Sequence, residues 1–247
     1  MNKTKIEWCD SSWNPVTGCF HSCPYCYART MVQRFGTGLL LKQPQVFVLD
    51  EPVIRNGKRL PYPTDFIPTL HRYRLGEYLN KKGRTIFVCT MADLFGEWVP
   101  DAWIEEVFEA CRKAPQHRYL FLTKNPARYV ELAEQGKLPN LDNMWYGTSV
   151  TTPDVEYFWA DDYHTFLSIE PILGMFEKSS PEKGHIEWIV MGAETGNRKN
   201  KVMPKKHWID GIIELCDEQH IPLFMKESMC QVVGEENMRR EFPWGET

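Results

Sequence analysis

The sequence predicts an α/β fold with parallel strands that are covered on both faces. Short apolar segments alternate with helical stretches, and most of these segments are near-continuous runs of β-branched, aromatic and aliphatic residues. Such alternation implies right-handed crossovers and a parallel sheet. The 247 residues suffice for one barrel-sized domain or two small ones, and 43% hydrophobic residues are enough to bury a substantial core.

Seven segments have the composition of buried strands. The predicted strands cover residues 13–17, 85–90, 119–123, 144–150, 165–169, 187–191 and 222–226. Five helices are predicted from apolar residues at helical spacing and from their start and stop residues, such as Asn125-Pro126 and Gly136. The predicted helices cover residues 27–35, 64–78, 100–114, 125–135 and 207–219.

The regular pattern fails in two places. Residues 36–63 form a long non-periodic insertion rich in proline and glycine, and residues 171–185 have too little apolar pattern for a crossover helix. We therefore expect one domain over residues 1–247, an incomplete and open-sided barrel in which residues 36–63 act as a lid or edge.

Three cysteines lie within eight residues, directly after the first predicted strand and a glycine. Cys19, Cys23 and Cys26 have the spacing C-x3-C-x2-C, and three thiolates on so short a loop suit a cubane iron–sulfur cluster with one iron left open. A zinc site that includes His21 as fourth ligand is an alternative, although paired zinc ligands are usually separated by a longer loop. Inert thiols are the second alternative.

The spacing, with the aromatic Tyr25 between the last two cysteines, resembles the signature of the radical S-adenosylmethionine (SAM) superfamily. The resemblance implies a partial (β/α)6 TIM-like barrel, a [4Fe-4S] cluster held by Cys19, Cys23 and Cys26, and SAM bound to the open iron. It also implies reductive cleavage of SAM to a 5′-deoxyadenosyl radical, which abstracts hydrogen from substrate. An electron donor such as flavodoxin or ferredoxin is the implied partner.

Further motifs narrow this resemblance. The chain is similar, over residues 5–226, to a family of phage and bacterial radical-SAM-like proteins, which is distantly similar to spore photoproduct lyase, a DNA-repair radical SAM enzyme. The motifs that carry this similarity are Lys5-Ile6-Glu7-Trp8, Trp13-Asn14-Pro15-Val16-Thr17-Gly18-Cys19, Met91-Ala92-Asp93-Leu94-Phe95, Leu122-Thr123-Lys124, Ile169-Glu170-Pro171-Ile172-Leu173-Gly174 and Gly192-Ala193-Glu194-Thr195-Gly196.

Polar residues follow nearly every predicted strand, and in a parallel barrel the carboxyl ends of the strands carry the chemistry. For any single carboxylate, marking the end of a strand is an equally good explanation. The resemblance implies that Tyr25 contacts the adenine of SAM and that Asp93 or Thr90 meets the methionine amino group. Residues implied to contact the ribose and methionine are Thr123, Ser149 and Glu170, and those implied to face substrate, as catalytic candidates, are Glu194 and Lys226.

Positive charge is concentrated after the sixth predicted strand, at Arg198, Lys199, Lys201, Lys205 and Lys206. This segment is either a solvated loop or a phosphate-contacting patch, and the second reading favours a nucleic-acid or nucleotide substrate. A non-catalytic, metal-dependent nucleic-acid-binding module is the alternative function. The net charge of −4 argues against nonspecific binding of polyanions.

The sequence also predicts a cytoplasmic protein without a membrane partner. The N-terminus lacks the apolar region of a secretory signal, and no apolar run approaches bilayer length. Eight cysteines in such a chain are expected to be reduced thiols.

Overall fold

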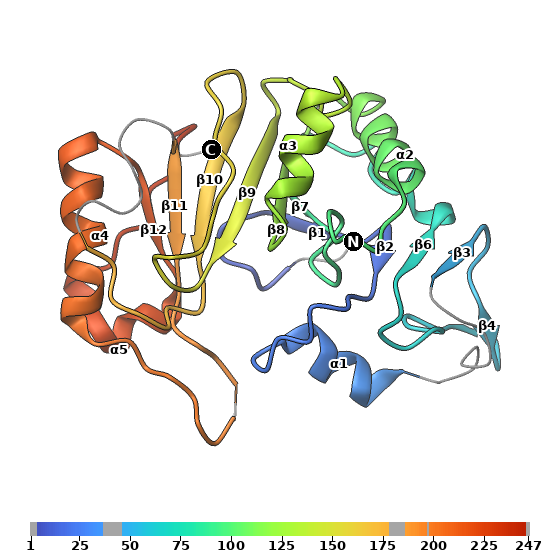
Figure 1. Ribbon diagram of the computed structural model, residues 1–247. Helices are drawn as coiled ribbons and strands as arrows, with labels where there is room; N and C mark the ends of the chain where they lie inside the picture. Colours follow the sequence, from blue (N-terminus) through green and yellow to red (C-terminus); the bar gives the residue numbers. More distant parts are fainter. Residues whose placement is uncertain (1–3, 37–45, 178–185, 197, 246–247) are drawn as a thin grey trace. The chain divides into compact units, whose positions relative to one another are not determined.

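The computed structural model describes residues 4–36, 46–177, 186–196 and 198–245. The chain divides into two compact units, residues 1–139 and residues 140–247, and both contain parallel strands and helices (Figure 1). Within the described ranges, no helix has the length and apolar character needed to cross a membrane. The single domain over 1–247 with a lid at 36–63 stays a prediction.

Three parallel strands form the main sheet of the first unit, in the order β1-β7-β8. The register places Ser11 opposite Ile86 and Ile86 opposite Tyr119. All four residues of β7 are buried, as expected for a strand covered on both faces. The bounds of these strands are Ser11–Trp13 for β1, Thr85–Val88 for β7 and Arg118–Thr123 for β8.

Two helices of this unit confirm their predictions. Helix α2 (Asp101–Arg112) connects β7 to β8, and helix α3 (Ala127–Glu134) follows β8. Asp101 lies in the first turn of α2, where a carboxylate is stabilised by the helix dipole, and Arg112 lies in the last turn. The apolar face of α2 is buried through Trp103, Ile104, Val107, Phe108 and Cys111.

The predicted strand over residues 13–17 is two strands. Strand β1 ends at Trp13, and β2 (Val16–Thr17) joins a different sheet with the order β2-β6-β3. Asn14 and Pro15 separate them, because proline lacks the N–H that would continue the ladder. Helix α1 (Tyr27–Phe35) then begins at the end of the cysteine loop and has the predicted bounds.

The predicted helix over residues 64–78 is wrong. The segment contains a turn, then β6 (Thr69–His71), then the short 3-10 helix η1 (Arg72–Arg74). Pro68 disfavours a helical conformation at the preceding residue, and Asp65 has a positive φ of 52°. Leu70 matches helical spacing by coincidence and is fully buried in β6, opposite Val16 of β2.

The insertion over residues 36–63 contains strand structure where it is described; residues 37–45 lie outside the described ranges. Strand β3 (Phe47–Leu49) pairs with β6, and β4 (Ile54–Arg55) and β5 (Lys58–Arg59) form a hairpin. Asn56 and Gly57 at the hairpin turn both have positive φ, as a tight Asn-Gly turn requires.

The second unit is built on four parallel strands in the order β9-β10-β11-β12. Their bounds are Met144–Val150 for β9, His164–Ile169 for β10, Trp188–Met191 for β11 and Leu223–Met225 for β12. Every residue of β9, β11 and β12 is buried, which confirms the composition-based prediction. The predicted parallel α/β arrangement is therefore present in both units.

Helix α4 (Lys206–Gln219) connects β11 to β12, close to its predicted bounds, and packs Ile209, Ile212 and Cys216 into the core of this unit. Residues 171–177 contain no helix, in agreement with the prediction, and residues 178–185 lie outside the described ranges. Short helices follow β12. They are η2 (Glu227–Met229), α5 (Cys230–Val233) and η3 (Glu235–Asn237).

Candidate functional site

The cysteine loop, residues 19–26, starts from a tightly packed glycine. The N–H of Gly18 donates to the carbonyl of Met91 at 2.9 Å, just beyond β7. Gly18 has a φ of +87°, and a Cβ atom there would lie 2.3 Å from the backbone of Ile67. Only glycine fits at this position. The N–H of Cys19 then donates to the carbonyl of Phe66 at 3.2 Å, so the first cysteine is held by the backbone.

The far end of the loop is held by helix α1. Cys26 is the N-cap residue, and its Sγ accepts a hydrogen bond from the N–H of Arg29 at 3.3 Å. The guanidinium of Arg29 also donates to the carbonyl of Cys19 at 3.0 Å, which joins the two ends of the loop. The positive end of the helix dipole therefore faces Cys26, as suits an anionic sulfur ligand.

All three thiols are free and half-buried. Burial raises the pKa of the Cys19 thiol to about 12, and the backbone N–H of His21 opposes the shift in part. Cys19 is therefore a neutral thiol without a metal, and metal binding at this position would release a proton.

Asp93 lies beyond β7 and connects the cysteine loop to the end of β8. Its side chain is buried, and each carboxylate oxygen accepts two hydrogen bonds. Oδ2 accepts from His21 Nε2 at 2.7 Å and from the N–H of Lys124 at 2.9 Å. Oδ1 accepts from Thr123 Oγ1 at 2.8 Å and from the N–H of Phe95 at 3.0 Å. Two predicted site residues, Asp93 and Thr123, are thus brought together.

Trp98 also contacts the cysteine loop. Its ring lies 5.4 Å from that of Phe20 and 4.8 Å from that of His21, both in edge-to-face geometry. The indole folds back over Gly96, where a Cβ atom would lie 2.4 Å from the ring. Gly96 is therefore required for Trp98 to reach this position.

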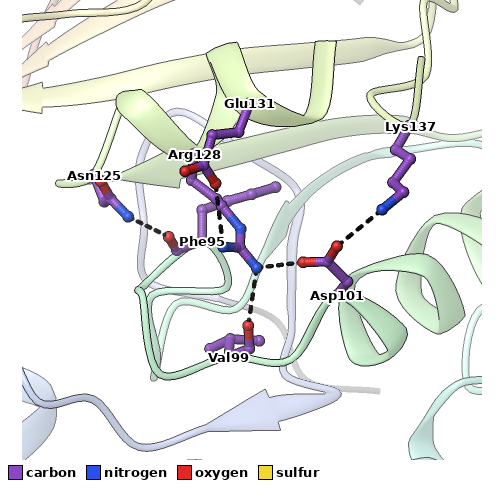
Figure 2. A network of polar contacts seen from close by, with 7 residues as sticks. All are labelled: Phe95, Val99, Asp101, Asn125, Arg128, Glu131 and Lys137. Atoms are coloured by element: carbon purple, nitrogen blue, oxygen red, sulfur yellow. Dashed lines mark hydrogen bonds and ion pairs between the residues drawn. The ribbon is translucent and has the colours of Figure 1, made fainter. Parts of the chain in front are cut away.

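The segment that carries Trp98 is fastened to α3 and to the end of β8 (Figure 2). Asn125 Nδ2 donates to the carbonyl of Phe95 at 2.9 Å, and Arg128 Nη2 donates to the carbonyl of Val99 at 3.3 Å. Arg128 also forms an ion pair with Asp101, the first residue of α2. Residues 93–99 are thus held by side chains from a neighbouring element.

The other predicted SAM contacts of the first unit lie around the loop. Thr90 donates through Oγ1 to Asn14 Oδ1 at 3.1 Å, and its carbonyl accepts from the hydroxyl of Tyr27 at 2.7 Å. The ammonium of Lys124 lies 5.5 Å from the ring centroid of Tyr25. Thr90 is thus tied to Asn14, while Tyr25 presents its ring to a cation.

In the second unit, Glu170 and Lys226 are brought together as an ion pair. Glu170 follows β10 and Lys226 follows β12, and both side chains are partly exposed. Gly192 follows the intervening strand β11, and a Cβ atom there would lie 3.0 Å from Lys226 Cδ and 3.3 Å from the Glu170 carboxyl. The glycine makes room for the pair at the carboxyl ends of three adjacent strands.

Glu194 does not join this pair. It is 4% exposed, and Arg198 donates to both of its carboxylate oxygens at 2.6 Å. The N–H of Val202 is a third donor, at 3.2 Å. These hydrogen bonds, the Arg198 guanidinium first, lower the pKa of Glu194. Its partners show that this carboxylate shapes the loop that follows β11.

Ser149 lies inside β9, buried and opposite Ser168 of β10. In the basic segment, Arg198 is engaged by Glu194, while Lys199, Lys201, Lys205 and Lys206 are exposed. The ammonium of Lys205 lies 5.9 Å from the ring centroid of Trp208. Four lysines therefore remain for contact with an anion.

The residues of the cysteine loop fit an iron–sulfur cluster by their chemistry. Three free thiols are the ligand set of such a cluster, and the N–H groups Arg29 Nε and Trp98 Nε1 are buried beside the loop without an acceptor among the described residues. Cluster sulfur is an acceptor for such donors. Across the described ranges, no three His, Cys, Asp or Glu side chains are grouped tightly enough to hold a single metal ion.

Sequence reasoning missed three residues of this site. Asn14 accepts from Thr90 Oγ1 and from the N–H of Met91, and Trp98 and Gly96 form the aromatic contact with the loop. A sequence signal could have identified Gly96 and Trp98. The pattern is a glycine followed two residues later by tryptophan, close after a predicted strand and the predicted site residue Asp93.

Comparison with solved structures finds the fold of spore photoproduct lyase. One match is "Spore photoproduct lyase complexed with dinucleoside spore photoproduct", at 10% identity, with 91% of this chain and 78% of that chain covered and a TM-score of 0.52. A cysteine-to-alanine mutant with the same dinucleoside matches at 11% identity, with the same coverage and TM-score. The predicted α/β fold of the partial-barrel type is confirmed.

No curated protein matches the sequence significantly. A family model does match, over residues 3–240, which is nearly the whole chain. The chain therefore belongs to the family described as "Protein of unknown function (DUF5131)".

Proposed function

We propose that the protein is a radical SAM enzyme that binds one [4Fe-4S] cluster through Cys19, Cys23 and Cys26. The observation that carries the proposal is the set of three free, half-buried thiols on one loop, held at both ends by hydrogen bonds. Its occurrence in a chain with the fold of spore photoproduct lyase supports the same reading.

When bound, the cluster and SAM supply a 5′-deoxyadenosyl radical that abstracts hydrogen from the substrate. The residues of the chain bind and shelter these groups. Cys19, Cys23 and Cys26 would hold the cluster through their thiolates, on a loop where all three are half-buried. The ring of Tyr25, with Lys124 nearby, is the proposed contact for adenine.

Glu170 and Lys226 are the strongest candidates in the second unit, because they are partly exposed and carry opposite charges at strand ends. We assign Glu170 to contacts with SAM and Lys226 to the substrate side. Glu194 is a weaker catalytic candidate, since Arg198 and Val202 already occupy its carboxylate. Thr90, Thr123 and Ser149 remain candidate SAM contacts.

A nucleic acid or nucleotide is the proposed substrate class. The solved structure with a similar fold is complexed with a dinucleoside spore photoproduct, and four exposed lysines, Lys199, Lys201, Lys205 and Lys206, offer contacts for phosphate in this chain. The proposed electron donor is a flavodoxin or ferredoxin, and the proposed location is the cytoplasm, where reduced thiols persist.

The test is anaerobic reconstitution of the full chain with iron and sulfide, followed by reduction in the presence of SAM. The proposal predicts a brown protein that forms 5′-deoxyadenosine. A colourless protein that retains stoichiometric zinc would contradict it and favour a metal-dependent binding module. Salt-sensitive binding of an oligonucleotide, weakened when the four lysines are replaced by glutamine, tests the substrate class; absent or salt-independent binding contradicts that class.

A further inference from the structure

We propose that residues 93–98, named the clamp segment, hold the cysteine loop in the conformation that accepts the cluster. Asp93 and Trp98 are its positioning residues, and His21 is the residue of the loop that they hold. This inference rests on the proposed function, because the clamp segment is proposed to prepare the loop for the cluster. The contacts themselves are independent of it.

The hydrogen bonds of Asp93 indicate a positioning role. A carboxylate has about four acceptor sites, and donors from the protein occupy all four in this buried side chain. No site remains for the amino group of a ligand. The resemblance assigns such a contact to Asp93 or Thr90, and the structure instead gives Asp93 the task of joining His21 to the ends of β7 and β8.

His21 is well placed to transmit this restraint. It lies midway between Cys19 and Cys23, and Ser22, its neighbour, has a positive φ of 56°. Backbone hydrogen bonds fix the loop at Cys19 and at Cys26. The His21–Asp93 hydrogen bond adds a third fixed point between the first two cysteines, where three residues would otherwise be free to turn.

Trp98 is the second contact of the clamp segment with the imidazole. Its ring is in edge-to-face contact with both Phe20 and His21. The side chain of His21 is thus held by a carboxylate and an aromatic ring from one short segment of chain. Because two different kinds of contact converge on one residue of the loop, the orientation of that residue is specified closely.

The clamp segment is itself rigidly supported. Asn125 holds the carbonyl of Phe95, and Arg128 holds the carbonyl of Val99, the residue that directly follows the segment, as Figure 2 shows. Asp93 accepts from the N–H of Lys124 and from Thr123 Oγ1, so the segment is also bound to the end of β8. Positioning groups around a metal site are effective when they are anchored on regular structure, as this segment is.

The test compares His21→Ala and Asp93→Asn with a matched control, His164→Ala. His164 also pairs with a carboxylate, that of Glu187 at 2.9 Å, and is also partly exposed, but it lies in the second unit and outside the cysteine loop. His21→Gln, which keeps an N–H donor, serves as the conservative variant. Gly96→Ala, which displaces the ring of Trp98, tests the aromatic contact separately.

The first readout is hydrogen exchange of the loop amides in the metal-free protein, measured by mass spectrometry. His21→Ala, Asp93→Asn and Gly96→Ala should each speed exchange over residues 19–26 by about tenfold, with exchange over β8 and α2 unchanged for His21→Ala. His164→Ala should leave the loop unaffected. The double variant of His21 and Asp93 should exchange no faster than the faster of the two single variants, because both changes remove one interaction.

The second readout is the rate at which a chelator removes iron from the reconstituted protein. Iron should leave His21→Ala about tenfold faster than the unmodified chain, and His21→Gln should restore much of the difference. Loop exchange that stays unchanged in His21→Ala overturns the inference, whatever the cluster result. If the unmodified chain binds no cluster, the proposed function fails, while the exchange result still decides whether the clamp exists.

Discussion

Asp93 and Glu194 are two carboxylates that follow buried parallel strands, one in each unit, and their partners differ in kind. Both are almost fully buried, at 5% and 4% exposure, and both accept hydrogen bonds from side chains and from a backbone N–H. Glu194 binds Arg198, four residues later, and so shapes its own loop. Asp93 binds His21, 72 residues earlier, and so connects the strand ends to the cysteine loop.

The comparison shows that a charged residue at a strand end is not by itself a ligand-binding group. Local partners make Glu194 a loop-forming residue, and distant partners make Asp93 a positioning residue. The Glu170–Lys226 pair is a third case, because within the described part of the second unit its side chains pair with each other and stay partly exposed. Of these three cases, this pair is the most accessible to a ligand.

The largest expected effect is a difference in cluster content between variants of the cysteine loop and variants of the other cysteines. Cys23→Ala should abolish cluster binding, because only two cysteine ligands would remain for a four-iron cluster that needs three. Iron and sulfide analysis after reconstitution measures this. Cys9→Ala is the matched control, since Cys9 is also a half-buried cysteine of the first unit. Equal cluster content in the two variants would show that Cys23 is not a ligand of the cluster.

The next effect compares Asp93 with Glu194 directly. Asp93→Ala should lower the free energy of unfolding by about 3 kcal/mol, because the backbone N–H groups of Phe95 and Lys124 and the Thr123 hydroxyl lose their acceptor. Glu194→Ala should cost less, because the half-buried Arg198 side chain regains water. Urea unfolding measures both. A larger cost for Glu194 would reverse the comparison.

At acidic pH, the free energy of unfolding should depend on the protonation of Glu194. Arg198 lowers the pKa of Glu194 in the folded protein, so the stabilising contribution is fully present above the unfolded value of about 4.3 and is lost as the pH falls through the lowered pKa. The difference in unfolding free energy between the unmodified chain and Glu194→Gln should therefore shrink as the pH drops below about 4.3. A difference that is constant with pH would contradict this account.

The smallest effect concerns the Glu170–Lys226 pair. A double-mutant cycle with Glu170→Gln and Lys226→Met should give a coupling energy of about 1 kcal/mol or less in thermal unfolding, as for other partly exposed ion pairs. The same variants should reduce formation of 5′-deoxyadenosine far more than they reduce stability. Full activity in both single variants would remove the pair from the proposed site.

Much of the fold could be predicted from the sequence, because local pattern and burial agree over most elements. Strand β9 and helix α1 have the predicted bounds, since one opens on the apolar residues Met144, Trp145 and Tyr146 and ends at Val150, and the other ends before Gly36. The predicted helix over 64–78 failed because Leu70 serves a strand whose partners, β2 and β3, are distant in sequence. Helical spacing cannot reveal such pairing.

The candidate site was less predictable for the same reason. The spacing of the cysteines is a local signal, and it was sufficient to locate the loop. The partners of Asp93 come from residue 21 and from residues 95–124, so the sequence alone could not show which protein groups donate to its carboxylate. Trp98 was missed because its contact with the loop depends on a backbone turn at Gly96.

The central claim is that three thiols on the cysteine loop bind a cluster with one iron open to SAM. Electron paramagnetic resonance of the reconstituted, reduced protein, recorded with and without SAM, tests it most directly. The account predicts the signal of a reduced four-iron cluster that changes shape when SAM is added, and no such signal in Cys23→Ala. A signal that is indifferent to SAM, or a protein that holds only a single metal ion, would contradict it.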